Sequence, residues 1–164
     1  MNEVIVNSKM KLSEHFKLGE LCKTSHKTAD GNIPSHVVIE NLKRLCPWLE
    51  ELRYSYNTLY CLTPGEDYDE SKNVEPIIIN SGYRSPAVNK LAGGSNTSNH
   101  LTGCAVDIRC AGKEQMIRYA SILLDIADGT KQDYDELLLE QHGSVCWLHF
   151  AVRPKDNRRK IAFL

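Results

Sequence analysis

Residues 98–107 read SNHLTGCAVD, and later in the chain residues 147–149 read WLH. These two stretches contribute His100, Asp107 and His149 from separate pieces of backbone. Two imidazoles and one carboxylate form the three-ligand set that binds a catalytic Zn²⁺ and leaves a fourth position for water. The pattern therefore indicates a zinc-dependent hydrolase.

Strand patterns surround two of these three residues. Gly103 allows the backbone to turn into an apolar run over 104–108. Alternation along that run places Asp107 mid-strand, and a second run over 145–152 places His149 in the same way. Acidic residues are depleted from strands and costly to bury, and a bound cation makes such burial favourable.

Each candidate ligand taken singly has a structural alternative. His100 would be an ordinary loop residue, Asp107 a salt-bridge partner of Arg109, and His149 a hydrogen-bonded core histidine. The three residues together, in this motif, favour a metal site over those alternatives.

A longer pattern contains the motif. Residues 79–86 read INSGYRSP, Asn89 follows, and residues 93–107 read GGSNTSNHLTGCAVD. This pattern resembles the zinc D-alanyl-D-alanine carboxypeptidase and L-alanyl-D-glutamate endopeptidase family, which cleaves bacterial cell-wall peptides and shares its metal site with the hedgehog signalling domain. The resemblance extends over about 12–152. It implies a hedgehog-like peptidase fold, Zn²⁺ as cofactor and the stem peptide of peptidoglycan as substrate.

Carried over position by position, the resemblance makes His100, Asp107 and His149 the zinc ligands. Ser98 and Arg84 resemble the family's substrate-side residues, and Arg84 is expected to bind a carboxylate or a developing oxyanion. The alternative for Arg84 is a loop arginine that ties neighbouring carbonyl groups together.

The general base is the point at which this chain departs from part of the family. Many of these peptidases carry an acid three positions before the last histidine, where this chain has Cys146. Strand alternation aims Cys146 away from the face of His149. Other branches, and the hedgehog domain, place a glutamate at the end of the preceding strand. By this resemblance Glu140 is the first candidate and Glu136 the second.

Strand geometry supports this choice only in part. A four-residue loop at 141–144 would place Glu140 opposite Val145 and Glu136 opposite His149. Glu140 would then lie roughly 13 Å along the strand from His149, too far unless a bulge or the side-chain lengths close the gap. If neither residue is the general base, Glu140 and Glu136 would be solvated charges of the hairpin or charges that keep an edge strand from pairing with another chain.

Two more residues near the motif have weaker assignments. His142, in the expected turn, would orient substrate or stabilise an oxyanion, although an exposed turn histidine is the simpler interpretation. Tyr83 either lines the pocket or packs beneath the loop, and packing is preferred.

Two other classes of function compete with metal-assisted hydrolysis. A cysteine peptidase would use Cys104 or Cys146 as nucleophile with a nearby histidine as base, but it leaves Asp107 unexplained. A non-catalytic, zinc-bearing domain that binds cell wall or belongs to a virion is the alternative outside enzymes.

Composition fits one soluble domain over 1–164. With 164 residues, of which 41% are hydrophobic, the chain can bury a core. A net charge of −1 without a basic stripe argues against a nucleic-acid partner. No apolar stretch is long enough to insert into a membrane, and the six cysteines form no C-x-x-C pair and are expected to be free thiols. A monomer is favoured.

The expected architecture is α+β, a small, largely antiparallel sheet that bears the zinc site, with helices packed on one side. Ser35 is expected to cap a helix with apolar positions from Val38 to Leu52, and Pro47 to start a second segment or a kink. The other expected elements are a strand at 76–80, a short helix at 85–91, the metal-bearing strand at 104–110, a helix at 114–127 ended by Gly129, and a hairpin of strands at 135–140 and 145–152.

Three segments lie outside this core, which covers about 12–152. Residues 1–7 show no secretory signal, so we expect a chain made in the cytoplasm that acts at the wall after release, by phage lysis or on a virion; a trimmed signal would explain the absence equally well. Segment 62–75 is expected to be a solvated insertion, with a calcium loop as alternative. The basic tail 153–164 is expected to be solvated, with contact to an anionic wall as alternative.

The residues do not name the bond that is cleaved. A D-Ala-D-Ala carboxypeptidase needs a pocket for a free C-terminal carboxylate, whereas an L-Ala-D-Glu endopeptidase needs an open groove. The endopeptidase is preferred for a chain without a visible signal.

Overall fold

The computed structural model describes residues 7–72 and 74–164, so residues 1–6, on which the expectation about a signal mainly rests, lie outside the described residues. The helices are α1 (Leu18–Leu21), α2 (His36–Tyr56), α3 (Pro86–Leu91) and α4 (Lys113–Thr130), with a π-helical turn η1 (Asn57–Cys61) and a 3₁₀ turn η2 (Asn99–Thr102). The strands are β1 (Ile79–Ser81), β2 (Ala105–Cys110), β3 (Glu136–His142), β4 (Val145–Ala151) and β5 (Lys160–Phe163).

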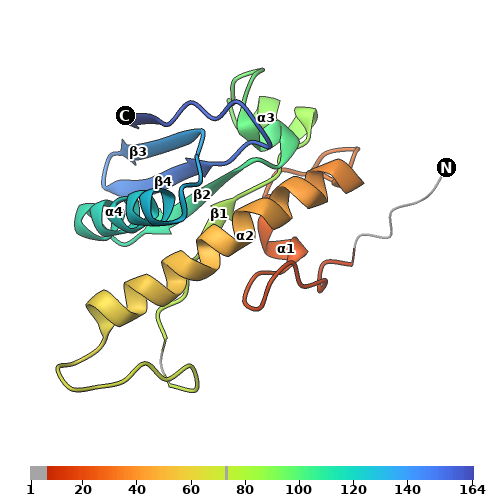
Figure 1. Cartoon of the computed structure of the whole chain (residues 1–164). Coiled ribbons are helices and arrows are strands. Elements are labelled where there is room, and N and C mark those ends of the chain that lie inside the picture. The colour runs from red at the N-terminus through yellow and green to blue at the C-terminus, as the bar shows by residue number, and fades with distance from the viewer. Residues whose placement is uncertain (1–6, 73) are drawn as a thin grey trace.

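The five strands form one mixed sheet in the order β1-β2-β4-β3-β5 (Figure 1). The pairings β1 with β2, β2 with β4 and β3 with β4 are antiparallel, and β5 runs parallel to β3. The predicted α+β class with a largely antiparallel sheet is confirmed. Asp107 and His149 lie on β2 and β4, two neighbouring inner strands of the sheet.

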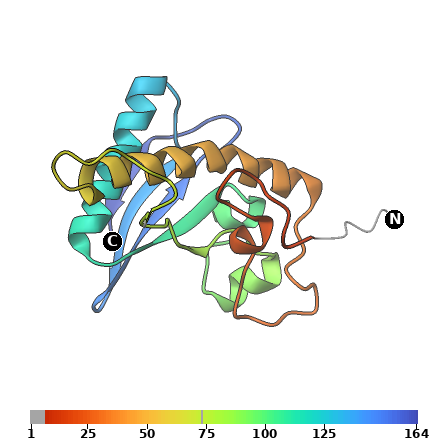
Figure 2. The same cartoon turned by 90° about the horizontal axis from the view of Figure 1, so that it is seen from below.

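One face of the sheet packs against the two long helices, of which α2 runs across the molecule in Figure 2. Alternation turns Val106, Ile108, Leu148 and Phe150 to this side, where they are buried in one core with residues of α2 and α4. Trp48 of α2 packs on Phe150 with ring centroids 5.2 Å apart. The other face is therefore left to carry the polar candidate residues.

Helix α2 begins where the sequence predicts. The side chain of Ser35 accepts a hydrogen bond from the backbone N–H of Val38, which satisfies a free donor of the first turn. The second helical segment expected to start at Pro47 is wrong, because one helix continues from His36 to Tyr56 with Pro47 inside it. Leu45 and Leu49, on either side of the proline, are fully buried, and this packing holds the helix together despite the missing N–H donor.

Helix α4 is longer than the sequence predicts. Gly129 lies inside it, and the helix ends at Thr130 with Lys131 as C-cap in the left-handed region, at φ 55°. The N–H of Lys131 donates to the carbonyl of Ala127, which closes the last turn. A lysine therefore takes the capping conformation that was expected of the glycine.

The hairpin between β3 and β4 has a tighter turn than the four residues expected. His142 pairs with Val145, which leaves Gly143 and Ser144 as the turn, and Gly143 adopts a φ of 61°. Such left-handed backbone is what short hairpin turns require. The tighter turn moves Glu140 opposite Trp147 rather than Val145, and Glu136 opposite Ala151 rather than His149.

The expectation of a solvated tail over 153–164 is wrong for its final part. Residues Lys160–Phe163 form β5, which pairs in parallel with β3 from Glu136 to Leu139. The N–H of Leu164 donates to the carbonyl of Leu139, and that of Gln141 to the carbonyl of Leu164. The free edge of β3 would otherwise expose unpaired backbone groups, and the tail covers it.

The acidic insertion forms neither helix nor strand over its described residues, 62–72 and 74–75. Its contact with α2 is an ion pair in which Arg53 donates to both carboxylate oxygens of Glu70, and Tyr68 packs edge-on against Tyr54. Across the described part of the chain, the helices are too short or too polar to cross a membrane.

Candidate metal centre

Three side chains from different elements converge on the open face of the sheet. Asp107 on β2 and His149 on β4 are direct register partners, and His100 arrives from the turn η2. One ligand atom from each residue lies within 4.8 Å of the other two, and all three residues are buried. The structure therefore brings together the three residues that the motif predicts as ligands.

The turn η2 orients His100 through its own backbone. Ser98 caps it, accepting a hydrogen bond from the N–H of His100, and Gly103 ends it in the left-handed region at φ 72°. A Cβ on Gly103 would lie 2.8 Å from the carbonyl oxygen of Val38 in α2, so only glycine allows this close approach. His100 Nδ1 lies 2.6 Å from the carbonyl oxygen of Gly82, which directs Nε2 toward Asp107.

Asp107 is the centre of the group. Its Oδ1 lies 3.2 Å from His100 Nε2 and 3.0 Å from His149 Nδ1, and Arg84 donates to its Oδ2 over 2.8 Å. Burial by itself would raise the pKa of Asp107, but the hydrogen bonds from the two histidines outweigh it and hold the pKa well below its usual range. Asp107 is therefore an anion.

His149 lies between two carboxylates. Its Nδ1 faces Asp107, and its Nε2 lies 3.0 Å from Oε2 of Glu136. Burial would lower the pKa of His149, but the hydrogen bonds with these carboxylates raise it to about 9. The hydrogen bond with His149 in turn lowers the pKa of Glu136 to about 2. Surroundings that favour a positive charge on His149 also favour a divalent cation at this place.

The residues fit a zinc ion by their chemistry and by their support. Two imidazole nitrogens and one carboxylate oxygen are a common zinc ligand set. Each histidine is also held by a second group, the carbonyl of Gly82 for His100 and Glu136 for His149, as in most such sites.

A further polar network supports Glu136. Asp135 is fully buried and accepts hydrogen bonds from Arg158, Asn99 and Arg153. Asn99 also donates to Oε2 of Glu136, and Arg158 donates to its Oε1. The residue before His100 and the C-terminal segment are therefore both connected to the carboxylate that contacts His149.

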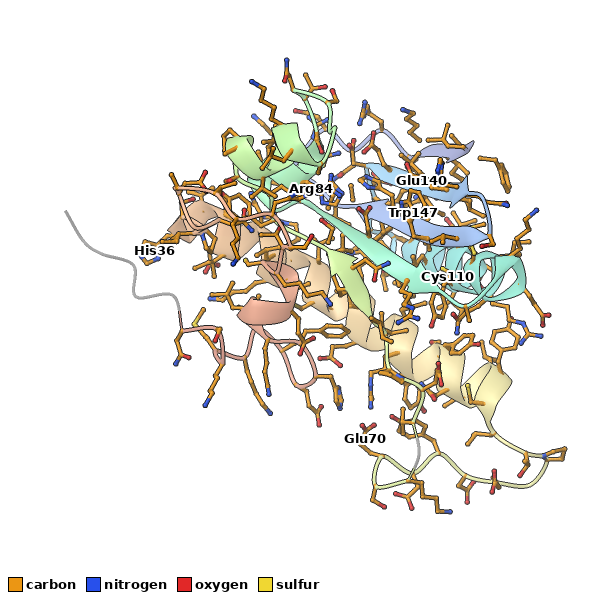
Figure 3. All side chains as sticks on the ribbon, turned by 180° about the vertical axis from the view of Figure 1, so that it is seen from behind. His36, Glu70, Arg84, Cys110, Glu140 and Trp147 are labelled. Atoms are coloured by element: carbon orange, nitrogen blue, oxygen red, sulfur yellow. The ribbon has the colours of Figure 1, made fainter. Side chains whose placement is uncertain are left out.

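The centre lies in a pocket of about 770 Å³. Its walls come from the loop after α3, from the open face of β2, β4 and β3, and from the C-terminal segment. The lining residues include Arg84, Ser98, Asn99, His100, Asp107, Glu136, Leu138, Glu140, Trp147, His149, Arg153, Arg158 and Lys160. Figure 3 shows Glu140 beside Trp147, with Arg84 further along the same face.

The remaining predicted residues lie in different places. Arg84 lines the pocket but also donates to Ser81 and Asp107, so part of its guanidinium group holds a candidate ligand. Tyr83 is buried in the hydrophobic core, and His142 is exposed at the end of β3; neither is among the pocket-lining residues.

The two candidate cysteine nucleophiles lie outside this pocket. Cys146 is buried in the core on the helix-covered face, opposite to His149. Cys104 is also buried, and burial raises the pKa of its thiol above the ordinary value. Neither thiol lines the pocket, as the cysteine peptidase alternative would require.

Sequence reasoning missed several residues of the pocket, among them Asn99, Trp147, Arg158 and Lys160. Asn99 stands inside the motif, and its position next to His100 was the available signal. Trp147 shares a strand face with His149, and alternation alone would have found it. Arg158 and Lys160 belong to a segment whose basic character is visible in the sequence, but only the pairing of β5 brings that segment to the pocket.

Comparison with known proteins agrees with the motif. No curated protein matches the chain. Residues 14–131 match the family described as Peptidase M15, a match that includes His100 and Asp107 and ends before β3. The placement of His149 and Glu136 is thus a result of the structure, independent of the matched region. Because the match covers most of the chain, this protein belongs to the Peptidase M15 family, the zinc D-alanyl-D-alanine carboxypeptidase type of metallopeptidase.

Proposed function

We propose that this protein is a zinc-dependent peptidase that hydrolyses the peptide part of bacterial peptidoglycan. The observation that carries the proposal is the convergence of His100, Asp107 and His149, with ligand atoms within 4.8 Å of one another, in the wall of a large pocket. Membership of the Peptidase M15 family supports the same reaction class.

The three ligands would hold zinc through His100 Nε2, an oxygen of Asp107 and His149 Nδ1. When bound, zinc lowers the pKa of its water to about 7 and polarises the scissile carbonyl group. Arg84 keeps Asp107 in place through Oδ2. The part of the Arg84 guanidinium group that lines the pocket is available to a substrate carboxylate or oxyanion.

Glu140 is the proposed general base, and Glu136 has a different role. Both oxygens of Glu136 already accept hydrogen bonds or contact His149, which makes Glu136 a positioning residue. Glu140 lines the same pocket and has no side-chain hydrogen bond or ion pair with any residue the structure describes. The two-residue turn places it opposite Trp147, roughly 7 Å along the strand from the level of His149. A glutamate reaches across that distance with the help of one water.

The bond proposed for cleavage is that between L-Ala and D-Glu. The pocket extends from the loop after α3, past the three ligands, to the C-terminal segment. Space on both sides of the candidate metal position suits an internal bond of an extended peptide better than a chain end. In this proposal the protein reaches the cell wall after release from the cell in which it is made.

A non-catalytic wall-binding or virion domain is the second candidate. The observation in its favour is Cys146, which takes the place of the family's acid and is buried on the face opposite to His149. In that case the zinc site would stabilise the fold and the pocket would bind peptide without turnover.

Digestion of purified peptidoglycan by the zinc-loaded protein, with mass-spectrometric identification of the products, separates these candidates. We expect cleavage between L-Ala and D-Glu that is lost in His149→Ala. The exposed Glu114→Gln on α4 is the matched control and should cleave normally. Stoichiometric zinc without any product from several wall types would favour the binding domain.

A further inference from the structure

The C-terminal segment adds cations to the pocket beyond the candidate metal centre. Arg153, Arg158 and Lys160 all line it. Lys160 is the register partner of Glu136 across the parallel pairing of β5 and β3. Paired residues of neighbouring strands share a face, so Lys160 lies on the same face as His149 and the pocket.

The three cations differ in how strongly the protein already holds them. Arg158 makes two hydrogen bonds of 2.7 and 2.9 Å with Asp135 and one of 3.0 Å with Glu136. Arg153 also donates to Asp135, which is fully buried. These two arginines therefore balance the two carboxylates of the network.

Lys160 is the loosely held member. Among the residues that the structure describes, Lys160 forms an ion pair with Glu136, in which Nζ lies 3.9 Å from Oε1. This oxygen already accepts a hydrogen bond from Arg158. The side chain of Lys160 is 52% exposed. Three cations thus face two carboxylates in this cluster, and the surplus positive charge lies on Lys160, at the rim of the pocket.

We propose that Lys160 forms an anion subsite that binds a free carboxylate of the peptide substrate next to the scissile bond. A single carboxylate, that of Glu136, separates Lys160 from His149. An extended peptide advances about 3.4 Å per residue, so the bound group belongs to a residue within about two positions of the cleaved bond. This inference rests on the proposed peptidase function.

Two sources in a stem peptide have this chemistry. One is the α-carboxylate of D-Glu, which stays free because this residue is linked through its γ-carboxyl group. The other is the C-terminal carboxylate of D-Ala-D-Ala, which meets the distance condition when the cleaved bond is the one between the two D-Ala residues. Both are recognised by the same ammonium group, and the experiment separates them by the probes it uses.

The test is the binding of two probe pairs to the metal-free protein by calorimetry. The first pair is L-Ala-γ-D-Glu-L-Lys amide with the D-Glu α-carboxyl group free or amidated. The second is acetyl-L-Lys-D-Ala-D-Ala with a free or amidated C-terminus. The wild type is expected to bind the free acid of one pair about three- to tenfold more tightly than its amide, as one partly exposed charge pair allows. The pair that shows the preference identifies the source.

Three variants assign the preference to Lys160. Lys160→Gln should bind acid and amide equally, Lys160→Arg should keep the preference, and the exposed Lys155→Gln on the same segment should behave as the wild type. Equal binding of acid and amide by the wild type in both pairs would overturn the proposal. So would a preference that survives in Lys160→Gln, or one that Lys160→Arg loses completely.

Binding and cleavage fail independently in this design. If the protein prefers the free acid through Lys160 but cleaves no wall peptide, the proposed peptidase function is wrong and the anion subsite still stands. If the protein cleaves wall peptide but binds acid and amide equally, only the proposed anion subsite is wrong.

Discussion

Glu136 and Glu140 lie four positions apart on one face of β3, on either side of Leu138, yet their surroundings assign them different tasks. Glu136 contacts His149 and accepts from Asn99 and Arg158, so its orientation is set by the fold. Glu140 lines the pocket beside Trp147. Spacing in the sequence cannot separate these roles, because it gives both residues the same face.

Replacing each glutamate by glutamine should separate binding of zinc from catalysis. Glu140→Gln is expected to lower kcat/KM by about 10²- to 10⁴-fold with zinc affinity unchanged, the usual contribution of a general base. Glu136→Gln is expected to weaken zinc binding by about 10- to 100-fold, because it loosens the support of His149. Steady-state kinetics and competition with a zinc chelator measure the two quantities. Unchanged kcat in Glu140→Gln would transfer the role of base to another group.

The lowered pKa of the buried Asp135 carboxyl group should make the stability of the protein depend on pH. Burial would raise its pKa, but the hydrogen bonds from Arg158 and Asn99 lower it to about 2 from the ordinary 3.8. Since the folded-state pKa is the lower one, the stabilisation is fully present above about pH 4 and is lost as the pH falls toward 2. A shift of this size corresponds to about 2 kcal/mol. Urea unfolding between pH 2 and 7 should show this loss in the wild type and a flatter dependence in Asp135→Asn. Identical slopes would contradict the assignment.

At the scale of elements, the turn η2 depends on one close approach to α2. A methyl group on Gly103 would meet the Val38 carbonyl at 2.8 Å, and the backbone there has φ 72°. The turn would have to shift, and His100 would shift with it.

Gly103→Ala is therefore expected to destabilise the protein by about 1–3 kcal/mol and to weaken zinc binding. Gly129→Ala is the matched control, because it lies inside α4 with nothing within 4 Å of an added Cβ. It should stabilise the protein by up to about 1 kcal/mol without any effect on zinc. Thermal unfolding and zinc titration of both variants check this. Normal zinc affinity in Gly103→Ala would show that η2 does not orient His100 in this way.

At the scale of the whole molecule, the C-terminal segment covers one edge of the sheet and also supports the candidate metal centre. Strand β5 covers the edge of β3, and Arg158 connects Asp135 with Glu136. The edge covering by β5 and the hydrogen bonds of Arg158 come from the same short segment, so changes in this segment should alter the stability of the protein and its zinc affinity together.

Deletion of residues 158–164 is expected to lower the melting temperature by several degrees, which is the effect of losing a few kcal/mol in a domain of this size. It should also lower zinc affinity by about tenfold. Arg159→Gln removes exposed ion pairs with Asp128 and Asp133 and should cost less than about 1 kcal/mol. A truncated protein with unchanged zinc affinity would show that the segment only covers the edge.

Local features of this protein could be predicted because they depend on neighbours in the chain. The Ser35 cap, the alternation of strand faces around Asp107 and His149, and the turn at Gly103 each involve residues within a few positions. The helix boundary at Pro47 failed as a prediction because the buried residues on either side of the proline outweigh its local preference. The cap at Gly129 failed because Lys131, two residues later, adopts the left-handed conformation that ends α4.

The sequence by itself determined the Peptidase M15 family and the three candidate ligands, because the motif and its spacing specify a turn that carries His100 followed by a strand that carries Asp107. Only the tertiary structure decided that Glu136 supports His149, that Glu140 faces Trp147 and that Lys160 reaches the pocket. These placements depend on the register of β3 and on the pairing of β5. Both are set by one short turn and by contacts between residues far apart in the chain, which no local pattern encodes.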